Sequence, residues 1–472
     1  MPDRVIIMGA GPAGLAAAHV LTSNGIPPTV YERSPWVGGL ARTIERDGFR
    51  FDIGGHRWFT KNDAIHQFFV AVVGDELIEV DRVSRIYFEG KYFYYPLRIG
   101  NALAGMGLRR SIRALADALA VTLRPLRIDG EATMEQAYIN QFGRTLYEQF
   151  FKTYSEKVWG LRCDQVSGDW VAQRSKGLSL TTAIKDALTR SRGEIESLVE
   201  RFSYPRLGIG RFSERMAEDV RAGGGEIALN SRVVRVHHDG QRVTGVTVRT
   251  ERGDLRVEGD AFISSIPITQ LARAFRPPAP AEVIAAANAL RFRELITVNL
   301  MLRRPQVTSD TWLYIHDPAI PFARIHEPRN WSPAMAPEGT TSLVCELFCN
   351  RGDAFWTAPD DVLIELAVKE FAELGFFDRQ EVLDGFVVRA VRAYPVYTLG
   401  YQRHLDVLKR YLRRFENLQI VGRYGTFRYN NSDHSVETGI LAARNLLGER
   451  HDLDLVNSAP EYLEERRRAV VA

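Results

Sequence analysis

The stretch that decides the fold is RVIIMGAGPAGL, residues 4–15. A short apolar run, Val5 to Met8, leads directly into the pattern Gly9-x-Gly11-x-x-Gly14, and an apolar helical pattern follows. In such a strand–turn–helix unit the first glycine permits the tight turn, the second lets the backbone approach a pyrophosphate, and the third lets helix and strand pack closely. The N-terminus of the helix then faces the phosphates. The stretch predicts a dinucleotide site.

A second predicted strand supports this interpretation. It reads PTVYE, residues 28–32, and it ends on a carboxylate 18 residues beyond Gly14. The side chain of Glu32 can accept hydrogen bonds from a ribose hydroxyl. Its negative charge favours an unphosphorylated ribose, because a site for NADP would prefer a cation there.

Two glycine pairs follow the second strand. Glu32-Arg33 precedes Gly38-Gly39 and Arg42, and a second pair stands in Gly54-Gly55-His56. This pattern resembles that of FAD-binding proteins of the amine-oxidase and glutathione-reductase-like superfamily. The resemblance implies that the first pair and the following arginine wrap the pyrophosphate and that the second glycine turn passes the flavin ring. FAD is therefore the predicted cofactor.

Length and composition bound the remaining possibilities. The chain has 472 residues, enough for about three domains of ~150 residues each. Its net charge of +3 is too small to indicate nucleic acid as a partner. We expect no signal peptide and no transmembrane helix. The three cysteines are few and indicate a reducing compartment, so we expect a cytoplasmic protein. Cys345 and Cys349 lie in a stretch that alternates like a strand, where both would face one side, which favours packing over metal binding.

The order of the predicted elements favours an α/β fold. We expect a Rossmann-type FAD-binding domain, glutathione reductase-like, with an inserted helical domain and a mixed-sheet substrate domain. The cofactor domain would be discontinuous, because a predicted β-meander and the last 75 residues both return to it. The expected segments are 1–96 (FAD-binding, first part), 97–200 (helical), 201–274 (FAD-binding, with the meander), 275–395 (substrate sheet) and 396–472 (FAD-binding, last part).

One predicted helix in the inserted domain is basic and amphipathic. It covers residues 98–127, and arginines occupy its polar side. Its apolar stripe consists of Leu103, Leu108, Ile112, Leu115 and Leu119. A helix of this kind commonly packs its stripe into a core, and that is our first expectation. The alternative is peripheral contact with a membrane surface through residues 101–127, or a place beside a lipid-linked substrate.

The C-terminal half makes a more specific resemblance visible. The segments that carry it are, in order, GGH (54–56), FKTYSEKVWG (151–160), AQRS (172–175), PFARIHE (321–327), RAYPVY (392–397) and GRYGTFRYNNSDHS (422–435). In this order they resemble segments of the UDP-galactopyranose mutases, and the resemblance spans nearly the whole chain. It implies that Arg174 and Arg324 hold the substrate diphosphate.

The resemblance also implies roles for the other residues of these segments. The expected catalytic residues are Arg174, Arg324, Tyr394 and His56, and the expected substrate-binding residues are Tyr154, Trp159, Arg392, Tyr397 and Tyr429. The chemistry suits a nucleotide sugar. Two separated guanidiniums can clamp a diphosphate bidentately, a tryptophan offers a flat face to a base, and tyrosines can bond a leaving phosphate oxygen.

The cofactor residues follow from the same motifs. They are Gly9, Gly11, Pro12, Ala13, Gly14, Glu32, Arg33, Gly38, Gly39, Leu40, Arg42, Gly54, Gly55, His56, Val234, Gly422, Arg423, Asp433, His434 and Ser435. In flavoproteins of this type a backbone near Val234 holds the adenine. The helix that starts near Asp433 would present N–H groups and positive potential to the flavin pyrimidine.

Two enzyme classes remain open. The resemblance implies a pyranose–furanose mutase acting on a UDP- or dTDP-linked sugar, in which reduced FAD serves as nucleophile and NAD(P)H could supply the reduction. However, Arg57-Trp58 is not typical of those mutases and resembles protoporphyrinogen-oxidase-like proteins. The alternative is an oxidoreductase that passes a hydride from an amine, porphyrin or carotenoid-like substrate to oxidised FAD. A third, non-enzymatic interpretation is a scaffold that binds FAD but has lost catalysis. The sequence predicts no oligomeric state.

Overall fold

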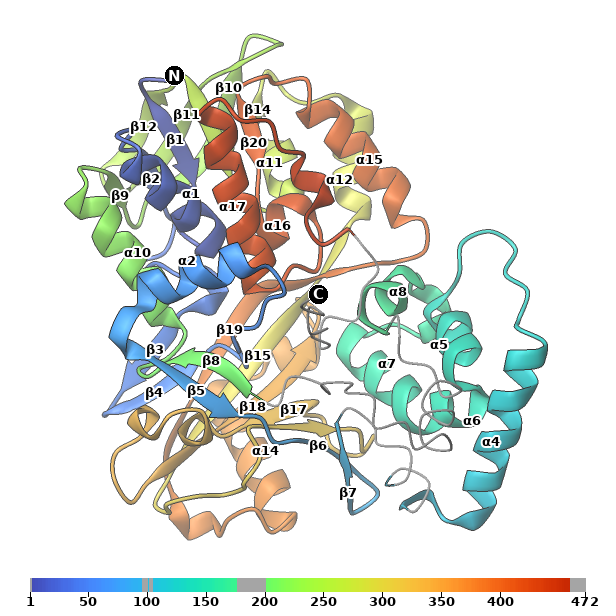
Figure 1. Ribbon diagram of the computed structural model, residues 1–472. Helices are drawn as coiled ribbons and strands as arrows, with labels where there is room; N and C mark the ends of the chain where they lie inside the picture. Colours follow the sequence, from blue (N-terminus) through green and yellow to red (C-terminus); the bar gives the residue numbers. More distant parts are fainter. Residues whose placement is uncertain (1, 96–100, 102–104, 176–200, 459–472) are drawn as a thin grey trace, which may run out of the picture.

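The computed structural model describes residues 2–95, 101, 105–175 and 201–458, and of residues 173–175 it describes the backbone alone. A parallel five-stranded sheet contains the motif that opens the chain. Its strands come from separated stretches of sequence, in the order β20 (Leu418–Ile420), β13 (Ala261–Ser264), β1 (Val5–Met8), β2 (Thr29–Tyr31) and β9 (Glu226–Ala228). In Figure 1 this sheet lies at the upper left, next to helices α1 (Pro12–Ser23) and α17 (Ser432–Leu446).

Helix α1 packs closely at two glycines. A Cβ atom at Gly14 would lie 2.0 Å from the carbonyl oxygen of Gly9, and one at Gly439 of α17 would lie 2.1 Å from the carbonyl oxygen of Ala13. Any larger residue at Gly14 or Gly439 would force the backbone of Gly9 or Ala13, respectively, to shift. The two glycines therefore fix the first and last parts of the chain against the turn that follows β1, as the sequence predicts for Gly14.

The meander forms a separate four-stranded sheet beside the parallel one. Its order is β12 (Gly253–Glu258), β11 (Val243–Thr250), β10 (Arg232–His238) and β14 (Phe275–Arg276). The expected turn at Asp239-Gly240 joins β10 to β11, where the Asp239 N–H donates to the Arg242 carbonyl at 3.1 Å. Two small antiparallel pairs lie below the parallel sheet in Figure 1. They are β3 (Thr43–Arg46) with β4 (Phe49–Asp52) and β5 (Leu77–Asp81) with β8 (Arg201–Pro205).

A mixed seven-stranded sheet forms the lower half of the molecule in Figure 1. Its order is β19 (Val382–Val396), β15 (Arg291–Leu302), β18 (Thr341–Cys349), β17 (Arg324–His326), β16 (Trp312–Ile315), β6 (Ser84–Phe88) and β7 (Lys91–Tyr94). All neighbours are antiparallel except β16 and β6. Cys345 and Cys349 are free, buried thiols of one apolar cluster under α14 (Asp360–Glu373), so both are packing residues.

Helices of the inserted region form a group at the right of Figure 1. They are α4 (Leu108–Leu123), α5 (Met134–Phe142), α6 (Arg144–Leu146), a π-helical turn over Tyr147–Lys152, α7 (Thr153–Trp159) and α8 (Asp169–Ser175). The remaining α-helices of the described ranges are α2 (Asp63–Val73), α10 (Gly210–Ala222), α11 (Ile268–Ala274), α12 (Ala281–Ala289), α13 (Ala354–Thr357), α15 (Tyr401–Leu412) and α16 (Gly422–Thr426).

The first expectation for α4 is wrong. Its apolar stripe is exposed, with Leu108 at 77% and Ile112 and Leu119 each at 60%. The side that faces the protein consists of small residues, Ser111 and Ala114 among them, because the helix seats closely there. Leu103, the remaining predicted stripe residue, lies outside the described residues.

The α/β class with several sheets is confirmed. The boundaries proposed for the five segments stay a prediction. Within the described ranges, no helix combines the length and apolar character needed to cross a bilayer.

Candidate functional site

The glycine-rich turn leaves room for a ligand at one position. A Cβ atom at Gly11 would meet no described atom within 4 Å, whereas the same atom at Gly9 would lie 2.3 Å from the Ser265 hydroxyl oxygen. The Glu32 carboxylate lies beside this turn at the end of β2. It accepts hydrogen bonds from the N–H groups of Ala10 and Ser34, both at 2.9 Å, so its oxygens are held in place.

The first glycine pair closes over the same turn. The Gly38 N–H donates to the Ala10 carbonyl at 2.8 Å, and a Cβ atom at Gly39 would lie 3.5 Å from the Gly11 Cα. Both glycines of the pair have positive φ, 95° and 57°, which side chains disfavour. Arg42 follows with its guanidinium 3.9 Å from the centre of the Trp36 ring, while Arg33 is exposed.

The second glycine pair packs on the seven-stranded sheet. A Cβ atom at Gly55 would overlap the Trp312 ring, 2.0 Å from its nearest atom, and one at Gly54 would lie 3.4 Å from the Glu346 carboxylate. The Gly55 N–H points to that carboxylate at 3.3 Å. This turn therefore brings the expected flavin side of the site against β16 and β18.

An ion pair lies under this turn. The Glu346 carboxylate, fully buried, pairs with the Arg324 guanidinium, and Arg324 also donates to the Tyr394 hydroxyl at 2.9 Å. Burial alone would lower the pKa of Arg324, but Glu346 and the neighbouring tyrosines hold it well above the usual value. The Nε of Arg324 is buried and has no hydrogen-bond partner among the described residues. It can donate to a bound acceptor.

A bulge in β19 directs Tyr394 toward this pair. Arg293 pairs with Tyr394 and Leu295 with Ala390, so three residues of β19 stand opposite Glu294 alone. Arg392, inside the bulge, has φ 58°, and its N–H donates to the Glu294 carboxylate. Bulges bend a strand and redirect its side chains, and they are common next to active sites. The Arg392 guanidinium faces the Gln270 carboxamide, at 2.9 and 3.2 Å, and not the Arg324–Glu346 pair.

Aromatic rings surround Tyr394. Its ring stacks on Tyr429 at 5.3 Å, and Trp159 meets both rings edge-on at 6.5 and 6.3 Å. Tyr154 lies on the same helix as Trp159 and stacks on His316 at 4.4 Å. Burial raises the pKa of Tyr394, which keeps its hydroxyl protonated at neutral pH. Four of the predicted site residues are therefore brought together here.

The C-terminal block supplies a second cation. The Arg423 guanidinium lies 5.1 Å from the centre of the Tyr394 ring and 4.9 Å from that of Tyr429. Its Nε donates to the Asn430 carbonyl at 2.7 Å. Gly422, one residue earlier, packs against α1: a Cβ atom there would lie 3.0 Å from the Ala13 Cβ. The block therefore joins the parallel sheet to the aromatic cluster.

The start of α17 is capped from within. The Asn431 side chain and His434 form a reciprocal cap, and the Ser435 N–H donates to the Asn431 carbonyl at 3.0 Å. Among the described residues, no capping side chain accepts a hydrogen bond from the first two N–H groups of the helix, those of Ser432 and Asp433. Asp433 is buried, and its Oδ1 accepts no hydrogen bond from any described residue.

Two guanidiniums, those of Arg324 and Arg423, affect the titration of His56. Burial, together with the charges of Arg423 and Arg324, lowers the pKa of this imidazole to about 4, and hydrogen bonds to backbone carbonyls oppose this shift. The imidazole Nε2 lies 3.1 Å from the Ile53 carbonyl oxygen. His56 is therefore neutral at pH 7, and both Arg324 and Arg423 act on it as positive charges.

Three predicted residues lie apart from this cluster or outside the described part. Tyr397 is 3% exposed in the core, stacks on Tyr401 at 4.5 Å, and accepts a hydrogen bond from the Tyr429 N–H at 2.8 Å. Val234 lies at an irregularity of β10, between Val233 and Arg235. Arg174 lies in α8, but its side chain is outside the described residues.

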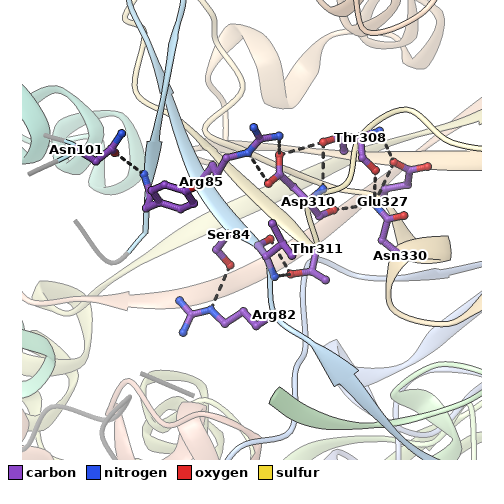
Figure 2. Close-up of polar contacts among 11 residues, drawn as sticks. Arg82, Ser84, Arg85, Asn101, Thr308, Asp310, Thr311, Glu327 and Asn330 are labelled. Atoms are coloured by element: carbon purple, nitrogen blue, oxygen red, sulfur yellow. Dashed lines mark hydrogen bonds and ion pairs between the residues drawn. The ribbon is translucent and has the colours of Figure 1, made fainter. Parts of the chain in front are cut away.

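A polar network holds β17 in place (Figure 2). Arg85 on β6 donates to both oxygens of Asp310 at 2.7 and 2.8 Å. Glu327, which follows β17, accepts from the N–H groups of Val307 and Thr308 and from the hydroxyl of Thr341. Because these carboxylates are buried and satisfied, they anchor the strand that carries Arg324 rather than face a ligand.

Sequence reasoning missed Glu346 and Trp312. Glu346 is a single carboxylate in the otherwise apolar strand TSLVCELFC (341–349), and a buried charge requires a partner. That was a usable signal. Its cation, Arg324, is 22 residues away in sequence, so the pairing itself required the sheet.

The comparisons agree with this architecture. The chain matches the family described as flavin containing amine oxidoreductase over residues 12–447. A solved structure of reduced UDP-galactopyranose mutase superposes with a TM-score of 0.83 at 22% identity, covering 98% of this chain and 99% of that one. A putative protoporphyrinogen oxidase from Exiguobacterium sp. 255-15 superposes with a TM-score of 0.70 at 19% identity, covering 95% of this chain and 99% of that one. An L-amino-acid oxidase of Demansia vestigiata is 20% identical, over 94% of this chain and 87% of its own length.

The fold and the site define a flavoprotein. The chain belongs to the flavin-containing amine oxidoreductase family, and its cofactor is FAD. The residues present fit FAD: there is open space at Gly11, Glu32 is held at the end of β2, and the start of α17 is buried. The mutase-like fold agrees with the resemblance seen in the sequence, but likeness at this identity concerns the fold alone.

Proposed function

We propose that this flavoenzyme acts on an anionic, nucleotide-activated sugar and interconverts its pyranose and furanose forms without net oxidation. The observation that carries the proposal is that two guanidiniums lie close to the Tyr394 ring. The guanidinium carbons of Arg324 and Arg423 are 5.9 and 5.1 Å from the centre of that ring. Guanidiniums of this kind stabilise phosphate oxygens.

The charge balance of the site favours an anion. Arg324 is paired with Glu346, so Arg423 is left as the excess charge beside a neutral His56. A cationic amine would be repelled at this place, whereas a diphosphate would be attracted. Because the Arg324 Nε has no partner among the described residues, one further hydrogen bond to a phosphate oxygen costs no existing contact.

Each side chain has a task in such a reaction. FAD, in its reduced form, supplies an electron-rich centre. Arg324 and Arg423 would bind the diphosphate and stabilise the charge that it gains on leaving. The protonated hydroxyl of Tyr394 would donate to a leaving phosphate oxygen. The rings of Trp159 and Tyr429 would hold the nucleotide and exclude water. Arg174, placed in α8, remains part of the proposed clamp.

An oxidoreductase is the second candidate. The L-amino-acid oxidase relative supports it, since the carboxylate of an amino acid could also bind Arg324. Hydride transfer from the substrate carbon to oxidised FAD would then be the reaction. A carboxylate needs one guanidinium, so this candidate gives Arg423 no contact with the substrate, whereas a diphosphate would use both guanidiniums.

A binding experiment tests the proposal. UDP and dTDP should perturb the visible flavin spectrum of the protein, and Arg324→Ala should weaken that binding by ~1.5–3 kcal/mol, the value of a lost hydrogen bond to a charged group. Arg174→Ala should act similarly. Arg162→Ala, an exposed arginine paired with Asp164, serves as the control. Equal UDP affinity of wild type and Arg324→Ala would contradict the diphosphate clamp.

A further inference from the structure

The outer side of α4 carries a continuous row of exposed apolar side chains. We call this row, consisting of Leu108, Ile112, Leu115, Leu119 and Leu123, the outer row. Its members are 77%, 60%, 40%, 60% and 72% exposed, in that order. Spacings of three and four residues place them on one face of the helix. Large aliphatic residues in such a row are unusual on a surface that faces only water.

The opposite side of α4 packs against the protein, so the outer row is not the side by which the helix joins the core. Ala114 and Ala118 belong to one buried cluster with Phe93 of β7 and Phe150. The backbone of α4 also meets Gly143, whose Cβ atom would lie 3.0 Å from the Ala118 nitrogen. The helix is thus fixed by its small residues, and within the described ranges the outer row is left to solvent.

Arginines flank the row. At 100° per residue, Arg109 and Arg113 fall on the arc next to it, and the described residues offer neither of them an ion pair. Arg110 pairs with Glu89 at 3.0 Å. The one carboxylate of α4, Asp117, is turned inward and accepts from the Thr145 N–H at 2.9 Å. The outer side of α4 therefore combines apolar and cationic character.

The same character continues beyond the helix. Leu126 and Ile128 are 39% and 38% exposed, and they alternate with Arg124 and Arg127. Figure 1 places α4 at the outer edge of the helical group, on the side away from α1 and β1. A flat surface could approach α4 there without meeting the parallel sheet.

We propose that α4 docks on an anionic lipid bilayer, with the outer row entering the interface and Arg109 and Arg113 meeting lipid phosphates. A helix with an apolar face, flanking arginines and low net hydrophobicity is suited to lie in the plane of a membrane surface. Charge complementarity selects this occupant over a second copy of the chain. A second α4 would offer the arginines no carboxylate, since Asp117 faces inward. The proposal does not depend on the reaction at Arg324.

Vesicle sedimentation of the FAD-loaded full chain tests the proposal. The protein should pellet with phosphatidylcholine vesicles that contain phosphatidylglycerol, weakly with phosphatidylcholine alone, and less at high salt. Each of Arg109→Gln and Arg113→Gln should lower the partition coefficient roughly fivefold. The triple variant Ile112→Gln, Leu115→Gln, Leu119→Gln should abolish binding. Leu255→Gln, at an exposed leucine of β12, is the matched control and should bind like wild type.

The flavin absorbance of each variant reports that it is folded, because replacements on an exposed face leave the FAD site unchanged. Wild-type protein that stays in the supernatant with anionic vesicles would overturn the proposal. So would a triple variant that pellets like wild type. A concentration-dependent dimer in light scattering that the triple variant loses, with no vesicle binding, would assign the outer row to a second copy of the chain instead.

Discussion

Arg324 of β17 and Glu346 of β18 are register partners on adjacent antiparallel strands, and their side chains form a buried ion pair beneath the Gly54-Gly55 turn. Glu346 thus contacts both the Gly55 backbone N–H and the Arg324 guanidinium. It would position Arg324 rather than touch substrate itself.

Removing one member of this pair should cost more than removing both. Glu346→Leu leaves the Arg324 charge buried and uncompensated, so we expect a loss of about 3–5 kcal/mol in the free energy of unfolding. The double variant Arg324→Met, Glu346→Leu should recover a good part of that loss. Chemical denaturation of the two variants and of Arg324→Met measures the coupling. Purely additive effects would mean that the pair contributes no mutual stabilisation.

Two glycines of the same motif should respond differently to one substitution. Gly11→Val places its side chain in open space, so the fold should persist while FAD is lost. Gly14→Val would push on the Gly9 carbonyl, 2.0 Å from the new Cβ, and should reduce soluble, folded protein. The ratio of flavin to protein absorbance and circular dichroism separate these outcomes. Full FAD occupancy in Gly11→Val would place the pyrophosphate elsewhere.

Acid should destabilise the protein through its buried histidines. Burial lowers the pKa of His326 and His316 to about 3 and that of His56 to about 4. Since the unfolded chain binds these protons near pH 6.5, the free energy of unfolding should fall as pH falls from about 6.5 towards 4. Asp52 acts in the opposite sense: burial raises its pKa to about 6, so its contribution falls as pH rises from about 4 to 6.

Thermal melts at a series of pH values measure this slope. His326→Gln removes one of the three groups, so its melting temperature should depend less steeply on pH than that of wild type, whatever its absolute value. Asp52 is common to both proteins and cancels in the comparison. Parallel curves would show that His326 is protonated equally in the folded and unfolded states.

Local signals made the opening strand–turn–helix unit predictable. The strand, the glycine turn and α1 follow from residues 4–23, because each rule involved spans a few residues. The C-terminal return to the sheet was also visible in the polar loop before α17. The joining of Tyr394 to Arg324 was not derivable from spacing, because it depends on a bulge in β19 and on the strand order of the sheet.

For helix α4 the sequence predicted the element but not the side that packs. Its 3.6-residue periodicity predicted the helix, but periodicity does not say which arc faces the protein. The alanine arc packs because small residues allow close approach, and the leucine arc is left outside. Only the neighbours, Phe93 and Phe150 among them, decide this.

The most direct test of the proposed reaction is the number of product molecules formed per electron pair. Anaerobic protein reduced with dithionite is given UDP- and dTDP-linked sugars, and the isomers are quantified against the flavin. An isomerase regenerates its reduced cofactor in each cycle, so many turnovers per reduced flavin are expected, with no turnover by the oxidised protein. A strict ratio of one product per electron pair, or turnover that starts only from oxidised flavin, would contradict the account and favour the oxidoreductase.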